Sequence, residues 1–371
     1  MLKTGTKKKK THQEGYWQLV WWRFKKNKLA LVGAIFIISL YVLILGFAGF
    51  IAPYSKTNQT DFPSAPPTKI VFKNADGKFS LFPSALGYTK EINQETYRRT
   101  FVPDKNTIMP IKLFIKGDKY RFMGFIPTRI HLFGVEKKGG YVFLFGTDKL
   151  GHDLFSRILY GGVLSLTIGL LGNILTLVLG TTMGLISCFY GGIVDTIIQR
   201  TTEFLSAFPA IPLFMALSAG IPPTVSPAMV YFLITLILVF VNWSKLCRQI
   251  RGMGLSLRER EYVLAAESAG ASDMRIIFRH ILPGTTSHLI VVTTLSIPYM
   301  ILAETALSWL GLGLRPPMVS WGVLLNEVID ISVLHYQPWL LIIIIWVIFT
   351  VMSFNMLGDG LRDALDPYSG R

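Results

Sequence analysis

A long apolar run near the start of the chain constrains its fold most strongly. Residues 29–51 contain no charged side chain over 23 positions, and as a helix they would be roughly 35 Å long. A transmembrane helix needs about 20 apolar residues. The run is longer than the apolar core of a cleaved signal peptide, which has about 7 to 15 residues. We therefore expect residues 29–51 to remain as a first transmembrane helix.

Further apolar stretches predict a protein that crosses the membrane several times. Hydrophobic residues make up 51% of the 371 positions and charged residues only 16%, which is too apolar for a soluble domain of this size. The further predicted spans lie near residues 164–189, 198–220, 228–243, 289–303 and 338–356. Glu203, Pro209 and Pro212 interrupt the second of these, although membrane helices tolerate proline. The predicted fold is an all-α polytopic membrane protein with six transmembrane helices.

Basic residues are distributed unevenly between these spans. Residues 1–28 carry nine Lys and Arg side chains and residues 244–284 carry seven, whereas residues 305–337 carry only Arg315. Basic residues near a span are retained on the cytoplasmic side. Six spans then place the N and C termini and the 244–284 loop in the cytoplasm.

The first 28 residues form a basic segment whose partner has to be inferred. The run Lys7–Lys10 could suggest nucleic acid, but it precedes Trp17, Trp21 and Trp22 and then a span. We interpret residues 1–28 as a cytoplasmic segment that meets anionic membrane lipid, with a solvated tail as the alternative and no nucleic acid involved.

The cysteines and histidines do not suggest a metal or redox site. The two cysteines, Cys188 and Cys247, fall at the end of a predicted span and in a predicted cytoplasmic loop. The six histidines are scattered, without the spacing of metal ligands. We expect no bound metal.

Residues 53–145 differ in composition from the rest of the chain and predict a separate small domain between the first two spans. They are polar, proline-rich and aromatic, with 15 basic and 7 acidic residues. Hairpin turns are predicted at Asp76-Gly77, Gly117-Asp118 and Gly139-Gly140. The predicted topology makes this β-rich insertion extracytoplasmic. It either contacts an extracytoplasmic binding protein or the mouth of a transport path, or it is a stabilising decoration.

A polar stretch between apolar runs, residues 261–284, has the pattern of two helices joined by a tight turn. Ala265, Ala266 and Ala269 give the first helix a small-residue face that a partner surface can approach closely. Gly270 supplies the backbone freedom to leave that helix. The stretch is therefore predicted to be a docking loop, with an ordinary amphipathic loop as the alternative.

The second helix of the loop has its own start and stop signals. Ser272 is a favourable N-cap, and Asp273 places negative charge in the first turn. Pro283 is expected to end the helix after Leu282.

The loop resembles the cytoplasmic loop of ATP-binding-cassette importer permeases, which has an Ala-Ala pair, a glycine four residues later and a Leu-Pro pair. The commonest version differs at Leu264 and His280, where Glu and Ile are usual. The oligopeptide and dipeptide branch is more similar, because Glu261-Tyr262 and Arg279-His280 match its acidic and basic pairs. The resemblance implies that this loop couples the chain to an ATPase through Glu261, Tyr262, Ala265, Ala266, Gly270, Asp273, Arg279, His280, Leu282 and Pro283.

Other segments resemble the same branch. Residues 146–169 are similar to the entry of its transmembrane domain, although His152 and Val163 replace arginines that are usual there. Residues 304–327 share its glycine-rich run and its Pro-Pro-x-x-Ser-Trp-Gly segment. Irregular backbone at membrane depth is tolerated beside protein or a water-filled cavity. We therefore predict an outer vestibule or transport path that includes Glu304, Gly311, Gly313 and Trp321.

Two details of these segments bear on function. Glu304 is a functional candidate because intramembrane carboxylates are rare, and a structural hydrogen bond to backbone freed by glycine and proline is the alternative. Residues 354–367 are similar to the branch's ending. With the N-terminal WRFKKNK segment and residues 146–367, the resemblance covers most of the chain outside the insertion.

The resemblance implies a transmembrane domain of the type I importer over residues 146–367. It further implies a homologous second permease subunit, two cytoplasmic ATPases and an extracytoplasmic solute-binding protein as partners, in the inner or cytoplasmic membrane of a bacterium or archaeon. The chain has no phosphate-binding loop of the Gly-x-x-x-x-Gly-Lys-Ser/Thr type. We expect no enzyme, no catalytic residue and no bound cofactor, with ATP used by the partner subunits.

The predicted function is import of peptides, coupled to the ATPases through residues 261–284. Import of nickel or oligosaccharides by the same architecture is the nearest alternative. A secondary transporter driven by an ion gradient is a further alternative, and it would need several charged residues deep within the spans.

Overall fold

The computed structural model describes residues 15–73, 79–92, 94, 97, 99–136 and 139–366. The Lys7–Lys10 run, the predicted turn at Asp76-Gly77 and Pro367 lie outside the described residues.

Helices form most of the described chain. The first span consists of α2 (Lys28–Tyr41), a π-helical turn η1 (Val42–Gly46) and α3 (Phe47–Ile51). The other long helices are α4 (Leu154–Tyr190), α7 (Pro227–Arg258), α10 (Leu282–Trp309) and α13 (Ile342–Leu365). Shorter helices are α1 (Tyr16–Lys26), α5 (Gly192–Ala207), α6 (Ala210–Ala219), α8 (Glu261–Ser268), α9 (Asp273–Ile276), α11 (Trp321–Asn326) and α12 (Ile331–Tyr336). A π turn η2 (Ile277–Ile281) precedes α10, and a 3-10 turn η3 (Pro338–Leu341) precedes α13.

Five helical segments of the described chain are long and apolar enough to cross a membrane: Lys28–Ile51, Leu154–Tyr190, Pro227–Arg258, Asp273–Trp309 and Pro338–Leu365. The segment predicted as a span over residues 198–220 is not one straight helix, because α5 and α6 meet at a bend of 90°. Pro209 follows the break. Phe208 has extended backbone angles of −93° and 139°, as the residue before a proline prefers. Helices α5 and α6 make a sixth span only if together they cross the membrane as one bent segment.

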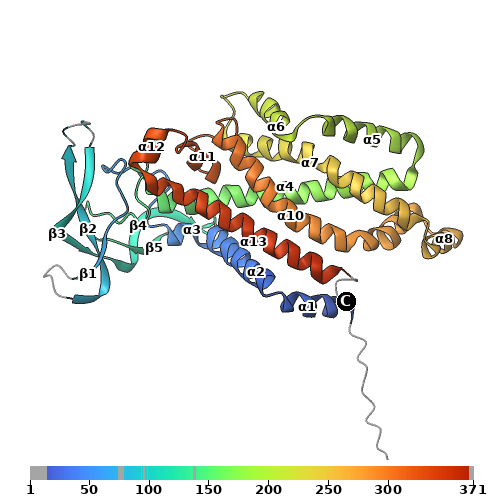
Figure 1. Cartoon of the computed structure of the whole chain (residues 1–371), viewed down its shortest axis with the longest axis horizontal. Helices are drawn as coiled ribbons and strands as arrows, with labels where there is room; N and C mark the ends of the chain where they lie inside the picture. Colours follow the sequence, from blue (N-terminus) through green and yellow to red (C-terminus); the bar gives the residue numbers. More distant parts are fainter. Residues whose placement is uncertain are drawn as a thin grey trace, which may run out of the picture.

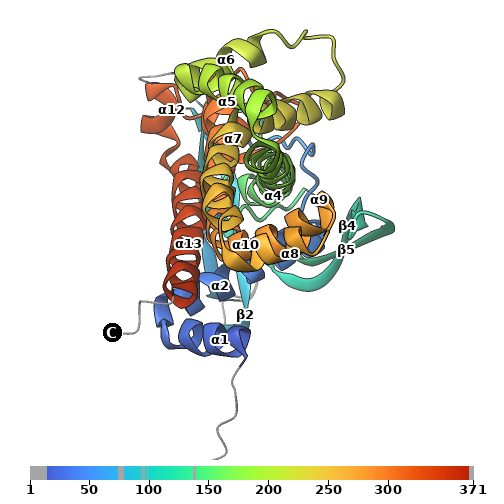
Figure 2. The same cartoon turned by 90° about the vertical axis from the view of Figure 1, so that its right-hand side faces the viewer.

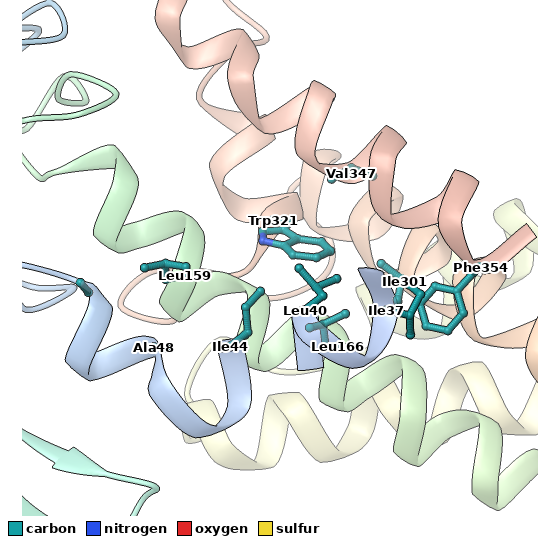
Figure 3. Packing of buried hydrophobic residues seen from close by; sticks show 11 residues of the cluster. Ile37, Leu40, Ile44, Ala48, Leu159, Leu166, Ile301, Trp321, Val347 and Phe354 are labelled. Carbon is teal, nitrogen blue, oxygen red and sulfur yellow. The ribbon is translucent and has the colours of Figure 1, made fainter. Parts of the chain in front are cut away.

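The long helices pack around buried apolar side chains (Figure 3). Trp321 is fully buried beside Ile44 from the first span and Leu159 and Leu166 from α4. Val347 of α13 lies in the same cluster. The apolar patterns that predicted spans therefore also supply the packing between them.

The insertion forms two antiparallel sheets. The first contains β1 (Ile70–Lys73), β2 (Phe79–Ile92) and β3 (Arg99–Pro110) in that order, and the second contains β4 (Lys112–Phe122) and β5 (Ile126–Gly134). Figure 1 shows the sheets at one end of the helical bundle and α8 at the opposite end.

Two of the predicted hairpin turns are wrong. Strand β4 continues through Gly117-Asp118, and the chain turns at Met123 and Gly124, which have φ of 52° and 87°. Gly117 instead leaves room for a neighbouring ring, since a Cβ there would lie 2.7 Å from His131 Cδ2. At Gly139-Gly140 there is also no hairpin, because β5 ends at Gly134 and the next residues pack aromatic rings such as Phe143 into a cluster.

The short helix α1 packs against the end of α13 (Figure 2). Arg23 Nη1 donates to the carbonyl of Asp366 at 2.8 Å, while Trp17, Trp21 and Trp22 are more than half exposed. Exposed indoles beside basic residues are typical of a membrane interface. The predicted contact of this segment with lipid stays a prediction.

Candidate functional site

The polar loop between α7 and α10 turns at a glycine. Gly270 follows α8 with φ of +77°, a conformation that glycine adopts without steric cost. Its N–H donates to Glu267 O at 2.9 Å, and Ala271 N–H donates to Ala266 O at 3.1 Å. These two bonds form a Schellman motif and satisfy carbonyls at the helix end. The tight turn predicted from the sequence is therefore present.

One side of the loop is anchored in the bundle. The anchoring side chains are at most 4% exposed, and they are Val263, Ile276, Ile277 and Ile281. They pack with Leu185 of α4 and with Leu246 and Ile250 of α7. Our sequence reasoning missed these anchors, although their apolar spacing within a polar stretch was visible.

The other side of the loop is open. Large apolar side chains that are 48% to 61% exposed lie here: Tyr262, Leu264, Met274 and Phe278. Of the predicted coupling residues, those that are exposed are Glu261, Tyr262, Ala265, Gly270, Asp273, Arg279 and Pro283, and those that are half-buried are Ala266, His280 and Leu282. The predicted residues thus share one accessible region, in which apolar surface alternates with charge.

The loop ends differently from the prediction at Pro283. The helix does not stop there, since α10 begins at Leu282 and continues to Trp309. The π turn Ile277–Ile281 directly precedes the proline. A proline inside a helix lacks an N–H and clashes with the carbonyl four residues earlier, and a wider turn relieves both problems. Ser272 has N-cap backbone angles but makes no side-chain capping bond.

An ion pair joins α7, the helix that leads into the loop, to α5. Arg251 of α7 donates to both carboxylate oxygens of Asp195 in α5, each at 2.6 Å. Ser187, near the end of α4, donates to Asp195 at 2.5 Å. Paired, bidentate bonds of this kind are directional and strong. Our sequence reasoning missed the pair, because a single Asp and a single Arg 56 positions apart carry no local pattern.

A polar cavity of about 360 Å³ lies between α4, α7 and α10. Its polar lining comprises Asn173, Thr176, Asn242, Lys245, Gln249, Thr293, Ser296 and Tyr299. Buried oxygens without a hydrogen-bond partner belong to three of these residues, Thr176, Gln249 and Thr293. Buried polar atoms in native proteins are normally paired with protein or water, so these three oxygens are exceptions in the wall of the cavity. No acidic residue is among its lining residues.

Glu304 is fully buried and holds together three segments distant in the chain. Its carboxylate accepts bonds from Ser165 at 3.0 Å, Ser308 at 2.7 Å and Ser320 at 2.8 Å. Each hydroxyl in turn accepts a backbone N–H, from Trp321, Leu314 and Val323 respectively. The observed contacts are those of the structural alternative, in which Glu304 supports irregular backbone through the serines.

The other predicted vestibule residues lie in different surroundings. Trp321 is fully buried, and its indole N–H donates to Ile158 O at 3.1 Å. Gly311 and Gly313 border two neighbouring cavities of about 510 and 380 Å³. Glu304 and Trp321 therefore support the segment of residues 310–320 from within, where Gly313 is also buried, against Ser308, while Gly311 is exposed. Their predicted part in a transport path stays a prediction.

A buried ionic cluster links the start of α4 to the residue after α11. Arg157 Nη1 contacts both Asp148 and Glu327, the latter at 2.8 Å. His152 Nδ1 lies 2.8 Å from Asp148, which also accepts the N–H groups of Leu150 and His152. His152 thus takes part in the hydrogen bonding of this cluster. Carboxylates removed from water need a nearby positive charge, and Arg157 supplies it for Asp148 and Glu327.

Burial changes the acidity of two neighbouring carboxyl groups. It raises the pKa of Asp153, the N-cap residue of α4, to about 7, although Ser156 donates hydrogen bonds to it. It also raises the pKa of Glu327, and Arg157 opposes that shift. In both cases desolvation of the charged form is the main cause.

The structure gives no positive evidence for a metal site. No group of three or more His, Cys, Asp or Glu side chains that could hold a metal ion occurs among the described residues. Cys188 and Cys247 are both free and buried. The expectation that no metal or cofactor binds stays a prediction.

Comparison with protein families gives two matches. Residues 176–369 match the model described as "Binding-protein-dependent transport system inner membrane component". Residues 15–67 match the model described as "N-terminal TM domain of oligopeptide transport permease C". The first match covers the second part of α4 and all of α5 to α13, including the loop.

Curated relatives agree with these matches. A dipeptide transport system permease protein of Lactococcus lactis is 33% identical over 362 residues, covering 95% of this chain and 90% of that protein. A dipeptide permease of Alkalihalophilus pseudofirmus is 40% identical and an oligopeptide permease of Bacillus subtilis 38% identical, each covering 60% of this chain and 71% of the relative. The Lactococcus match is long enough that it must include most of residues 53–145.

The fold defines a helical membrane protein with an exposed polar loop at one end. The family matches define it further: the chain belongs to the binding-protein-dependent transport system inner membrane component family. The resemblance proposed from the loop motif is confirmed.

Proposed function

We propose that the chain is the membrane permease subunit of an ATP-driven peptide importer. The observation that carries the proposal is the loop of residues 261–284, which is anchored by buried isoleucines and exposes a mixed apolar and charged surface at the end of the bundle. Exposed apolar side chains in such a cluster mark an interaction site. The curated relatives named above, described as dipeptide and oligopeptide permeases, support peptide cargo.

The proposed topology has six crossings, with α5 and α6 together as the bent one. It places both termini and the loop in the cytoplasm and the 53–145 insertion outside. The excess of Lys and Arg in residues 1–28 and 244–284 supports this orientation. The sheets and α8 lie at opposite ends of the bundle (Figure 1), as this topology requires.

Coupling would run through the loop to the helices. In the proposed complex, a second permease subunit pairs with this one, two ATPases bind the loops, and a solute-binding protein delivers cargo from outside. Movement of α8 would be passed to α7 and α4 through the isoleucine anchors and through the Asp195–Arg251 pair. A loop with a fixed turn and a packed base is suited to transmit such movement as one body.

The polar cavity between α4, α7 and α10 is the proposed part of the transport path within this subunit. Its amides and hydroxyls match the hydrogen-bonding groups of a peptide backbone, and Lys245 could receive a terminal carboxylate. Nickel is a poorer match, because the lining has no Asp, Glu, His or Cys ligand.

The test of coupling is Gly270→Pro, which forces a φ near −65° where the turn needs +77°. We expect uptake and co-purification with the ATPases to fall severely while the variant still inserts and folds. The control is Gly252→Ala, an exposed helical glycine of α7 with open space around its Cβ position. Wild-type uptake by Gly270→Pro would contradict coupling through this loop.

The test of cargo is uptake in cells that lack this subunit. Labelled peptides of two to six residues are compared with nickel and with a labelled oligosaccharide. We expect loss of peptide uptake and its recovery when the wild-type chain is restored. A defect confined to nickel or to the oligosaccharide would contradict peptide cargo and leave the coupling proposal in place.

A further inference from the structure

The two-stranded sheet β4–β5 lies against the end of the first transmembrane segment. The rings of Phe47 and Phe122 are 5.4 Å apart between centroids, and those of Phe50 and Phe114 are 6.1 Å apart. At Gly49 a Cβ would lie only 2.3 Å from Tyr120 Cδ2. The sheet therefore packs on the span itself, and Figure 1 shows α3 beside β4 and β5.

The tip of this hairpin reaches below the end of the span. Met123 Cε lies 4.0 Å from the position that a Cβ of Gly46 would take. Gly46 precedes Ile51, the last residue of the span, by five positions, which is about 7 Å along a helix. Interfacial segments bury their apolar side by about 5–10 Å at the boundary of headgroups and acyl chains. The tip is therefore at the depth of that boundary.

Exposed apolar side chains lie at the tip of the hairpin and along both of its strands. The exposed ones are Leu113 (61%), Phe114 (64%), Met123 (48%), Phe125 (70%), Ile126 (49%) and Ile130 (45%). In water this would be a costly surface, since apolar area is driven out of water. Beside a bilayer it continues the exposed apolar face of the first span, which includes Leu43 and Leu45.

The charge of the hairpin favours one kind of membrane surface. Five basic residues fall within strands β4 and β5, and they are Lys112, Lys116, Lys119, Arg121 and Arg129. The single acid there, Asp118, accepts bonds from Ser55 and Asn58. Within the described residues, Lys112 forms a salt bridge with Glu136. The remaining cations can meet lipid phosphates, because an anionic membrane surface attracts clustered Lys and Arg side chains.

Polar contacts hold the hairpin in place relative to the span. The ring nitrogens of His131 lie 2.6 Å from Ala52 O and 3.0 Å from Asp118 O. The Tyr120 hydroxyl donates to Ile130 O at 2.6 Å. Because Ala52 directly follows α3, these bonds tie both strands to the end of the span.

We propose that the β4–β5 hairpin lies in the lipid headgroup layer beside the first span. Residues 122–126 insert to the level of the upper acyl chains, and the basic side chains contact anionic phosphates. The hairpin is thus a second membrane contact of this subunit, built from strands. The inference does not depend on the proposed cargo, on the coupling loop or on which side of the membrane the insertion faces.

The experiment places a nitroxide spin label at Phe125→Cys in a variant with Cys188→Ala and Cys247→Ala, reconstituted in vesicles that contain phosphatidylglycerol. The matched control is Phe79→Cys, since Phe79 is 78% exposed but lies on β2 in the other sheet. Collision rates with oxygen, which concentrates in lipid, are compared with those of a water-soluble nickel chelate. We expect the oxygen-to-nickel ratio to be severalfold higher at position 125 than at position 79.

Two results would overturn the proposal. Equal, water-like ratios at both positions would show that the tip is in solvent. Low collision rates with both reagents at position 125, together with an immobilised spectrum, would show that protein covers it. A label at Ile126→Cys repeats the measurement if the first variant fails to fold. Replacing Lys119 and Arg121 by Gln should lower the ratio at position 125 toward that seen in vesicles of phosphatidylcholine alone.

Discussion

The two ends of the helical bundle place their polar groups in opposite ways. At the end that carries α8, charged and apolar side chains of the loop are exposed together, and buried isoleucines hold the loop from behind. At the other end, Asp148, Arg157 and Glu304 are at most 6% exposed and are all paired, Arg157 with Asp148 and Glu327 and Glu304 with three serines. Burial of a polar group is costly unless it is paired. The buried end is therefore fixed by its own contacts, whereas the loop end leaves its contacts for a partner.

The largest effect on stability is expected for Arg157→Met. This change leaves Asp148 and Glu327 buried without their shared cation, and breaking a buried ion pair in this way costs about 3–5 kcal/mol. The free energy of unfolding, measured with denaturant in detergent micelles, should fall by that amount. An exposed ion pair contributes at most about 1 kcal/mol. A smaller fall than this in the free energy of unfolding would show that the ionic cluster around Arg157 does not fix this end of the bundle.

Arg200→Met is the matched control for that substitution. Arg200 pairs with Glu203 at 2.9 Å, but both side chains are more than half exposed. An exposed pair contributes at most about 1 kcal/mol. The difference between the two Arg-to-Met variants then measures the effect of burial on the same chemical change.

A second, smaller effect should depend on pH. Burial raises the pKa of Asp153 to about 7, so the folded chain holds a proton that the unfolded chain releases near pH 4. The stability from this group is fully present below pH 4 and is lost as the pH rises to 7. Asp153→Asn keeps an acceptor for the N-cap and should remove about 3 kcal/mol of this loss between pH 4 and pH 7.

The measurement is the unfolding free energy of wild type and Asp153→Asn at several values between pH 4 and pH 7. We expect the two curves to converge at pH 4 and to separate toward pH 7, with the variant more stable. Parallel curves would show that Asp153 does not titrate in this range. Burial at the N-terminus of α4 would then raise the pKa of Asp153 less than the structure indicates.

The sequence predicted elements governed by local rules and missed those governed by packing. The Schellman turn at Gly270 follows from a backbone angle that glycine readily adopts, and it was predicted. Gly117 and Pro283 carry equally strong local signals, but tertiary contacts override them. At Gly117 the ring of His131 takes the space that the missing Cβ leaves, and at Pro283 a π turn lets the helix continue.

The candidate site shows the same division. Exposed residues such as Tyr262 and Gly270 were predicted from the family motif, whereas the exposed Met274 and Phe278 were not. The site's supporting groups were not predicted either, since Arg251 pairs with Asp195 and Glu304 pairs with Ser165 across long stretches of the chain. A pairing of single polar residues across such distances leaves no periodicity to read.

The smallest effect on stability is expected for Met274→Asp in the loop. Met274 is 61% exposed, and substitutions at such positions usually change stability by no more than about 0.5 kcal/mol. The same change places a charge in the proposed contact surface, where a desolvated, unpaired carboxylate is unfavourable. Capture of the ATPases by the purified chain should therefore fall while its unfolding free energy stays unchanged. If instead stability falls and capture is kept, the loop is part of the fixed body of the protein, and the contrast between the two ends does not hold.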